Sequence, residues 1–507
     1  ARVSRVPLQE VARLGAGTAI TAIQIDLAKR ENRLIPWKKN APETFRTARS
    51  LLAGDRGGYI FEPAVGLHED VIELDFASLY PNIMVSRNIS PEVTQCGCCA
   101  PEGGSGGSTP QRHDRDEAPD DMIAWAERMA RRKVPQLDSW MCARRMGFIP
   151  RSLAPVVARR EAYKKRRKSD PERRRQHQEC VDIYKWLLVT SFGYQGYKNA
   201  KFGRIECHEA IGAWGREILL RTTEIAREHG YERVHGIVDA LWLARSPNAP
   251  GLPSAMIAQE ISASVSEEIG IAFEYEGRYK WIVFLPNRRD PLGPHAPAIG
   301  ALNRYYGCFD TKPDKPNRSQ PGQPTDHLAQ GLLKVRGVEY RQHSTPPILQ
   351  AAQKAYLETV ARADDRASFV RLLPDAIDAV LPILQQLRRG EVPLQQLVFV
   401  NSVGRALEEY RASTLAHAAV KQLHRAGVRV EPGQSVRYVV LDDKEKDPAR
   451  RVVETRLMRG DETYDAAYYE RQLLRCIASL TLPFGWDEAR LADRYSGRPQ
   501  RALPLLA

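Results

Sequence analysis

The segment 71–84 constrains the fold of this chain more than any other, because an apolar run leads directly into an acid and then a turn. Residues 71–74 are an apolar-rich run that predicts a buried strand. This strand delivers Asp75 to its end, and Tyr80-Pro81 then leads the chain into an expected helix. A carboxylate at a strand end can hold a hard cation such as Mg²⁺, although most aspartates in such places cap helices or form turns.

The decapeptide 75–84, Asp-Phe-Ala-Ser-Leu-Tyr-Pro-Asn-Ile-Met, resembles motif A of the family-B DNA polymerases, which usually reads Asp-x-x-Ser-Leu-Tyr-Pro-Ser-Ile. The resemblance implies that Asp75 and the carbonyl of Phe76 bind Mg²⁺. It also implies that Tyr80 lies under the deoxyribose and excludes a 2′-hydroxyl, whereas taken alone this residue could be an ordinary core tyrosine. The residues implied to contact the nucleotide are Phe76, Ser78, Leu79 and Tyr80.

The bulk properties of the chain fit a nucleic-acid-binding enzyme with several subdomains. At 507 residues it is too long for one compact core. Its net charge of +13 and pI near 9.3 favour a polyanionic partner. The alternative explanation of this charge is a generally Arg-rich proteome. The apolar runs are too short to span a membrane and the first residues do not read as a secretory signal. Eight cysteines are too few for a disulfide scaffold, so we expect a reducing, cytoplasmic and nucleoid-associated setting.

The N-terminal part of the chain resembles the segment that precedes the palm in family-B polymerases. Residues 1–56 are similar to the segment that joins the exonuclease and polymerase domains of family B. A proofreading exonuclease would lie upstream of this chain, so we expect either a fragment or a polymerase without proofreading. Residues 57–95 are expected to form the first part of the palm, including motif A.

Residues 96–147 interrupt the family pattern with a cysteine-containing insert. A Gly- and Ser-rich stretch at 103–108 predicts a flexible loop, and an acidic stretch follows at 114–121. His113 could serve as a spare ligand beside four cysteines that could bind a structural Zn²⁺. The Cys-x-Cys-Cys spacing is not a standard zinc pattern, so ordinary reduced thiols are an equal alternative. The four residues are Cys96, Cys98, Cys99 and Cys142.

Residues 148–199 predict two helices separated by a charged turn, which the resemblance identifies as the fingers. On the first helix Arg160 and Lys164 stand four residues apart and therefore share a face. On the second, residues 185–193 resemble motif B, Lys-x-x-x-Asn-Ser-x-Tyr-Gly, and keep Lys185 and the final glycine. The resemblance implies that these three cations bind the incoming triphosphate and stabilise the leaving pyrophosphate. A solvated basic surface is the alternative.

Residues 200–340 are expected to complete the palm. Within them, 234–243 predicts a hairpin resembling motif C, Tyr-Gly-Asp-Thr-Asp-Ser. Aligned on its glycine, the second acid of the motif is Asp239, while Ile237 replaces the first. The resemblance implies that Asp239 and Asp75 hold two Mg²⁺ ions, for which Mn²⁺ could substitute. The loss of the other acid predicts weaker metal binding, a slower enzyme or an inactive one.

The rest of the chain predicts a primer-binding element and a helical thumb. Residues 286–330 are rich in Pro and Gly and predict loops. Within this stretch, 302–305 resembles the Lys-Lys-Arg-Tyr element that contacts the primer. After it, 334–340 resembles the palm-to-thumb element. The implied DNA contacts are Arg304, Tyr305, Lys334 and Arg336. The thumb, 341–507, predicts helices at 348–362, 366–389, 394–425 and 464–480 and a strand at 436–441, which suits non-specific grip of duplex phosphates.

Together these features predict an α/β (α+β) right-hand polymerase architecture, with a palm sheet, two-helix fingers and a mainly helical thumb. The expected function is template-directed addition of deoxynucleotides to a primer 3′-hydroxyl by two-metal-ion chemistry, without proofreading and in damage tolerance. Expected partners are primer–template DNA, deoxynucleoside triphosphates, and a sliding clamp or other replication and repair factors, with no membrane. The alternatives are an inactive polymerase-like DNA-binding scaffold and a general basic nucleic-acid-binding protein.

Overall fold

The structure is a computed structural model that describes residues 3–37, 47–99, 132–246, 254–287, 299–311, 328, 332–410 and 414–496. It divides into two compact units, one made of Ala1–Phe61 and Leu74–Tyr275, the other of Glu62–Glu73 and Glu276–Ala507. The predicted loop at 103–108, the acidic stretch at 114–121 and His113 lie outside the described residues. Among the described helices, none is both long and apolar enough to cross a membrane.

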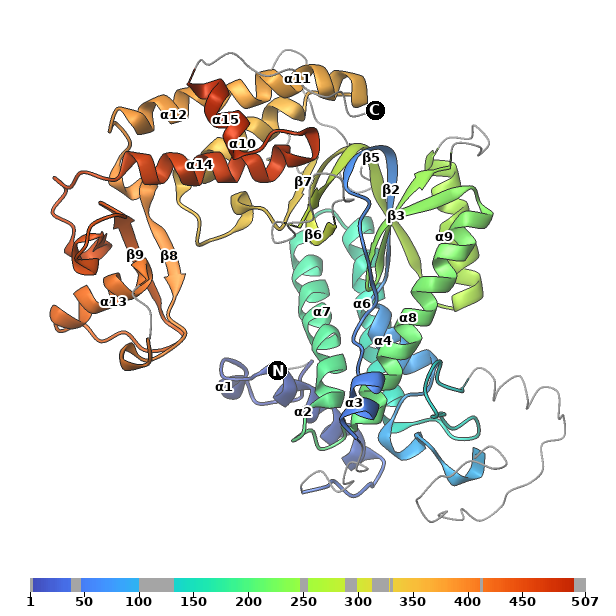
Figure 1. The fold of residues 1–507 in the computed structure, drawn as a ribbon. Coiled ribbons are helices and arrows are strands. Elements are labelled where there is room, and N and C mark those ends of the chain that lie inside the picture. Colours follow the sequence, from blue (N-terminus) through green and yellow to red (C-terminus); the bar gives the residue numbers. More distant parts are fainter. Residues whose placement is uncertain are drawn as a thin grey trace. The chain divides into compact units, whose positions relative to one another are not determined.

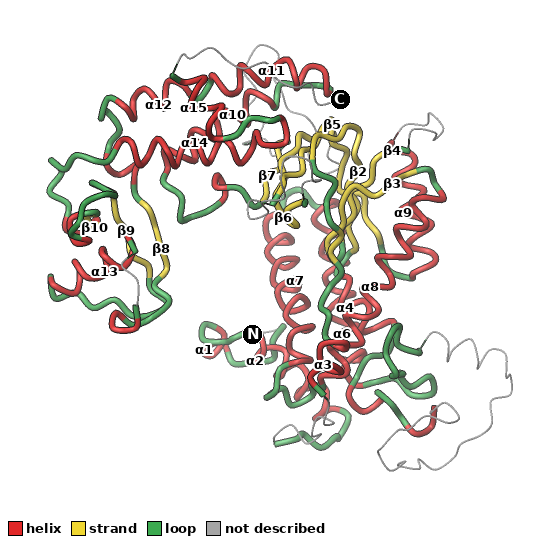
Figure 2. Tube along the Cα trace, in the orientation of Figure 1, coloured by secondary structure: helices red, strands yellow, loops and turns green. Residues whose placement is uncertain are grey.

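Seven strands form one sheet in the order β1-β3-β4-β2-β5-β6-β7, drawn in yellow in Figure 2. Adjacent strands are antiparallel in each pair whose register is defined: β1–β3, β3–β4, β5–β6 and β6–β7. The boundary between the two units falls within β2 and within β5. The bounds are β1 Ile60–Phe61, β2 Gly66–Phe76, β3 Tyr231–Ile237, β4 Ala240–Arg245, β5 Phe273–Pro286, β6 Gly300–Thr311 and β7 Leu333–Arg336. The predicted strand at 71–74 and the predicted hairpin are both confirmed.

Long helices dominate the first unit. The two helices predicted within 148–199 are confirmed as α6 and α7, which pack along each other (Figure 1). Helix α4 follows β2 and packs against α6, α7 and α8, while α2 packs against α7. The bounds are α1 Leu8–Val11, α2 Ala16–Arg30, α3 Ala48–Gly54, α4 Leu79–Ser86, α6 Phe148–Ser169, α7 Arg174–Gly196, α8 Ile205–Glu228 and α9 Ser254–Ile269.

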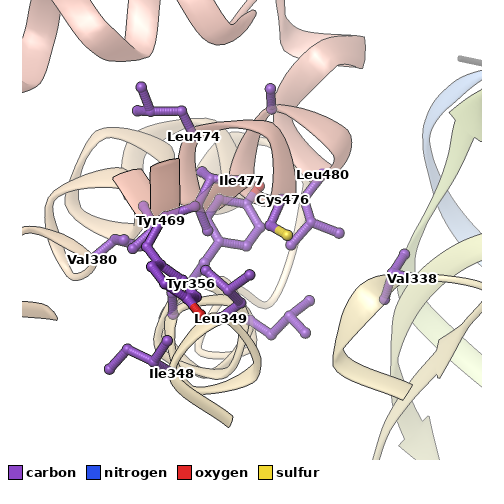
Figure 3. Packing of buried hydrophobic residues seen from close by; sticks show 14 of the residues in the cluster. Val338, Ile348, Leu349, Tyr356, Val380, Tyr469, Leu474, Cys476, Ile477 and Leu480 are labelled. Atoms are coloured by element: carbon purple, nitrogen blue, oxygen red, sulfur yellow. The ribbon is translucent and has the colours of Figure 1, made fainter. Parts of the chain in front are cut away.

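The C-terminal part of the second unit is a helical layer with a small sheet. The sheet has the order β10-β9-β8. Buried rings and aliphatic side chains fill the space between α10 and α14, where Tyr356 and Tyr469 lie close together among Ile348, Leu349 and Ile477 (Figure 3). The bounds are α10 Pro347–Val360, α11 Arg366–Asp378, α12 Leu381–Arg388, α13 Leu415–Arg425, α14 Ala466–Thr481, α15 Glu488–Tyr495, β8 Phe399–Ser402, β9 Ser435–Val440 and β10 Val452–Glu454.

Three predicted segments differ from the structure. The stretch predicted as loops at 286–330 contains β6, because its apolar residues pair with β5 on one side and β7 on the other. The helix predicted at 394–425 is wrong over its first half, where β8 pairs with β9, and among the described residues of this range only α13 is α-helical. The helix predicted at 366–389 is two helices, because Pro382 in the first turn of α12 cannot donate a backbone hydrogen bond into a preceding turn.

Candidate active site

The backbone brings the end of β2, which carries Asp75, beside the turn between β3 and β4, which carries Asp239. Asp75 is the second-last residue of β2, and β4 lies beside β2 in the sheet. The backbone N–H of Phe76 donates a hydrogen bond to the carbonyl of Asp239 over 2.9 Å. Both aspartates are half-buried. The backbone therefore brings together two aspartates that are 164 positions apart in the sequence.

A tight turn presents Asp239. The N–H of Asp239 donates to the carbonyl of Ile237 over 2.5 Å, which closes a γ-turn around Val238. Val238 has φ +52°, a left-handed conformation that is unfavourable for a β-branched residue. Its own N–H donates to the carbonyl of Tyr59, and Ile237 pairs with Ile60 of β1. The neighbouring strand therefore holds a strained turn in place, which is typical of functional sites.

The electrostatic surroundings of Asp239 include the motif B lysine. Burial raises the pKa of Asp239 above its ordinary value, and the positive charge of Lys185 on α7 opposes that rise. Lys185 is itself exposed. The predicted cation and the predicted metal ligand therefore act on each other electrostatically, even though one comes from α7 and the other from the β3–β4 hairpin.

Tyr80 is held in a row of aromatic rings. Its ring lies 4.3 Å from that of Phe192 on α7, and Phe192 in turn stacks on His208 of α8 at 4.2 Å between centroids. Burial raises the pKa of Tyr80 to about 12, and Asp239 adds to that rise. This row joins motif A to motif B.

Two glycines leave room for Tyr80. A Cβ on Gly58 would come within 2.7 Å of its hydroxyl oxygen, and a Cβ on Gly215 would come within 2.9 Å of its ring. Both distances are shorter than side-chain atoms tolerate, so any larger residue there would displace Tyr80. The sequence pattern did not single out either glycine.

Arg160 reaches back from α6 to motif A. Its guanidinium donates to Ser78 Oγ over 2.6 Å, and the residue is 8% exposed. Ser78 has φ +54° and immediately precedes α4, which begins at Leu79. Because the first N–H groups of a helix lack partners within the helix, this end of α4 attracts anions. Arg160 adds a fixed positive charge at the same point.

Lys164 forms ion pairs with two glutamates. Its Nζ lies 3.1 Å from both carboxylate oxygens of Glu274 and 3.4 Å from Glu161. Glu274 is on β5 and was not identified from the sequence, because a single exposed acid in an alternating strand carries no distinctive signal. The third predicted phosphate-binding cation is therefore neutralised in this structure.

The predicted DNA-binding residues of the second unit differ in accessibility. Arg336 is exposed, whereas Tyr305 is 2% exposed and burial raises its pKa well above the ordinary value. Arg304 donates to the carbonyl of Gly337 over 3.1 Å. Lys334 forms an ion pair with Glu73. Any contribution of Tyr305 to DNA binding therefore passes through its neighbours.

Glu73 lies within the apolar-rich run 71–74, and the sequence pattern did not single it out as a functional residue. It is 4% exposed and accepts a hydrogen bond of 2.6 Å from the hydroxyl of Tyr279, in addition to its ion pair with Lys334. An acid within an otherwise apolar strand was the available signal, because a buried carboxylate needs a partner. Its role is to fix Lys334 on the sheet.

The four predicted cysteines gather in one place in the first unit. Their sulfur atoms all lie within 4.8 Å of one another. Three of them are buried, and Cys98 is half-buried. Thiol–thiol hydrogen bonds lower the pKa of Cys142 and raise that of Cys96. The structure therefore confirms that these residues are neighbours.

Comparisons with known proteins show which proteins this chain is similar to. The model of the family described as DNA polymerase family B matches residues 6–249 and 303–483. A DNA polymerase of Thermococcus gorgonarius is 26% identical over 502 residues, which are 98% of this chain and 55% of that protein. DNA polymerase 2 of Saccharolobus solfataricus is 30% identical over 292 residues, 58% of this chain and 38% of that protein. The chain thus spans about half the length of the curated relatives it matches.

Solved structures show the same fold. The family B DNA polymerase from the hyperthermophilic archaeon Pyrobaculum calidifontis superimposes with a TM-score of 0.60 at 21% identity. The superposition covers 94% of this chain and 52% of that one. The predicted polymerase architecture is therefore confirmed at the level of the fold.

Proposed function

Because the chain belongs to the family B DNA polymerases, we propose that it is a template-directed DNA polymerase that adds deoxynucleotides to a primer 3′-hydroxyl. The observation that carries this proposal is the hydrogen bond from Phe76 to the carbonyl of Asp239, which joins the strand end that carries Asp75 to the turn that carries Asp239. A DNA-binding scaffold would have no need of such a pair. In this proposal residues 57–95 and 200–340 form the palm, 148–199 the fingers and 341–507 the thumb.

The donor set at the strand ends suits divalent ions. We assign the carboxylates of Asp75 and Asp239 and the carbonyl of Phe76 to Mg²⁺, with Mn²⁺ as a substitute, because Mg²⁺ prefers oxygen ligands. Burial raises the pKa of Asp239, so a cation there would relieve an unfavourable buried anion. Ions held by these residues would lower the pKa of the primer 3′-hydroxyl and neutralise charge on the triphosphate.

The chain's own residues bind and orient the triphosphate. The N-terminus of α4 offers the N–H groups of Leu79 and Tyr80, and Arg160 stands beside them through its hydrogen bond to Ser78. Lys185 adds a point charge and can protonate the leaving pyrophosphate. Lys164 joins them once it leaves its acidic partners.

The ring of Tyr80 would select the sugar. It packs against Phe192 on one side, which limits its movement away from a nucleotide bound above it. A 2′-hydroxyl would therefore meet a rigid surface. In the second unit, Arg304, Tyr305, Lys334 and Arg336 are proposed to position the primer–template duplex through its backbone.

Primer extension with Mg²⁺ and with Mn²⁺ tests the proposal. We expect the wild type to extend a primer, and Asp75→Asn and Asp239→Asn each to lower the rate by about 1,000-fold or more, because each removes a metal-binding charge. Asp493→Asn is the matched control, since Asp493 is an exposed acid on α15, and it should extend like the wild type.

The same assay separates the enzyme from the scaffold. Extension by the wild type would show that Ile237 is tolerated in place of an acid. Tight binding of primer–template DNA with no extension in either metal would overturn the enzyme proposal and support the DNA-binding scaffold.

A further inference from the structure

The four cysteines of the first unit have the geometry of a metal site. The sulfur of Cys142 lies 3.7 Å from that of Cys98 and 3.9 Å from that of Cys99, and the sulfurs of Cys98 and Cys99 are 3.8 Å apart. Cys96 lies within 4.8 Å of all three. A tetrahedral Zn²⁺ with bonds of about 2.3 Å places its thiolate sulfurs about 3.8 Å apart. The observed separations therefore match a single tetrahedral ion.

We propose that Cys96, Cys98, Cys99 and Cys142 bind one structural Zn²⁺, which fastens the start of α6 to the end of α4. The zinc site itself stands independently of the polymerase proposal. Only its effect on nucleotide binding, argued below, rests on the proposed function.

Other uses of these cysteines fit the geometry less well. A disulfide needs its sulfurs about 2.05 Å apart, and all four cysteines are free thiols. An iron–sulfur cluster places several irons and sulfides between its cysteines, which needs a wider separation than that observed here. Soft thiolate ligands in a tetrahedral set favour zinc among the common structural ions.

The backbone around the cysteines also suits thiolates. The N–H of Arg145 donates to the sulfur of Cys142 over 3.3 Å. Such hydrogen bonds stabilise negative charge on a ligating sulfur and fix its direction. Cys99 is 4% exposed and Cys142 is 1% exposed, so the ion would be shielded from water on that side.

Two chain segments are already aligned where the cysteines meet. The N–H of Cys142 donates to the carbonyl of Val93 over 2.8 Å, and Thr94 and Met141 form an isolated antiparallel bridge. The indole of Trp140 donates to the carbonyl of Cys96 over 3.1 Å. The ligands thus come from two segments that the backbone brings side by side, as in many zinc sites built from two short turns.

Residues 88–92, which precede the first three cysteines in the chain, cap the start of α6. The first N–H groups of α6 and its N-cap donate to side chains that come just after α4: Gly147 to Asn88 over 2.7 Å, Phe148 to Glu92 over 2.5 Å and Ile149 to Ser90 over 3.1 Å. The amide of Asn88 also donates to the carbonyl of Cys142 over 2.8 Å.

The zinc would therefore set the position of the triphosphate-binding cations on α6. Three of its ligands follow residues 88–92, which contact the start of α6, and the fourth, Cys142, comes just before α6. Helix α6 carries Arg160 and Lys164. Loss of the ion would loosen the base of the helix, and with it the position of Arg160 beside Ser78. We expect weaker nucleotide binding rather than loss of the metal-binding aspartates.

Elemental analysis of the whole chain tests the site. Protein purified without metal-chelating resin is expected to carry about one zinc per chain, and X-ray absorption at the zinc edge should show only sulfur ligands. Cys98→Ser and Cys142→Ser should each lower the zinc content at least about tenfold. Cys180→Ser is the matched control, because Cys180 is a half-buried free thiol on α7 outside the cluster, and it should retain the full zinc content.

Each outcome decides the proposal. Wild-type protein without zinc, with iron in its place, or with disulfides among these cysteines would overturn it. If the cluster variants fail to fold, the zinc content and ligand set of the wild type decide the question alone. Removal of zinc by a chelator should raise the KM for the incoming nucleotide several-fold. Zinc present in a chain that does not extend primers would leave the site intact and overturn only the polymerase proposal.

Discussion

The two units of the molecule differ in where their backbone is strained. Among the described residues from 276 onward, every residue with a positive φ is a glycine, such as Gly433 at +93°. In the first unit, non-glycine residues adopt this conformation, and two of them flank the proposed active site: Ser78 at +54° and Val238 at +52°. Such conformations persist only where surrounding contacts enforce them. The first unit therefore holds strained residues beside the proposed chemistry, whereas the described non-glycine residue of this kind in the second unit is Asp70 at +51°, which forms an ion pair with Arg278.

The C-terminal region of the second unit is instead stabilised by burial of apolar side chains. Tyr356 and Tyr469 are fully buried and their hydroxyls are satisfied, that of Tyr469 by the carbonyl of Leu397 over 2.7 Å. The hydroxyls of Tyr306 and Tyr356 lie 3.1 Å apart. A core of this kind provides stability without placing a charged group for catalysis.

The largest effect in this comparison should come from the cation beside Ser78. Arg160→Ala should lower kcat/KM for nucleotide incorporation by about 100-fold, because it removes a fixed charge from the triphosphate. Arg160→Lys should recover part of the loss, since it restores the charge without the guanidinium fork. Single-nucleotide incorporation kinetics measure both.

Arg175→Ala is the control for Arg160. Arg175 lies on α7, is 93% exposed in its side chain and pairs with Glu179, so its loss should leave kcat/KM unchanged. Equal losses in Arg160→Ala and Arg175→Ala would mean that general positive charge, rather than the position beside Ser78, supports the reaction.

The next-largest effect compares two buried isoleucines, one in each unit, for their contributions to stability and to activity. Ile477→Ala in the core of the second unit should lower the free energy of unfolding by about 3 kcal/mol, because it empties a fully buried site. At temperatures where the variant is folded, its kcat/KM should match the wild type. Ile83→Ala, at an equally buried site on α4, should lower both quantities. Chemical denaturation and incorporation kinetics on the same samples provide the comparison.

Stability and activity should change in opposite directions at Val238. Val238→Asn should raise the free energy of unfolding by about 0.5–1 kcal/mol, because asparagine adopts a positive φ more readily than a β-branched residue. The looser turn should slow primer extension by about threefold, since Asp239 is then held less firmly.

A glycine of the second unit provides the contrast to Val238. Gly433→Ala should lower stability by about 1 kcal/mol, since alanine is strained at φ +93°, while extension stays unchanged. If Val238→Asn lowered stability instead, the turn would not be a store of strain and the contrast between the units would fail.

The parts of this fold that local patterns determine could be predicted from the sequence. The run before Asp75 has the composition of a buried strand, and the finger helices have the period of helices. The segment 394–425 was predicted wrongly because its apolar spacing fits a helix locally, whereas β8 forms through pairing with the distant β9. The contact between Arg160 and Ser78, and the one between Lys164 and Glu274, join residues 82 and 110 positions apart. No local pattern contains information of that kind.

The smallest effect should come from the acid that holds Lys164. Glu274→Gln should lower the KM for the incoming nucleotide by about two- to threefold and leave kcat unchanged, because Lys164 no longer has to leave an ion pair to bind a phosphate. The effect should shrink as salt is added, since Glu274 is 45% exposed in its side chain and the pair is screened. Glu179→Gln, which releases the exposed Arg175 on α7, is the matched control and should change neither constant. A raised KM in Glu274→Gln would mean that the acid positions Lys164 for the nucleotide rather than competing with it.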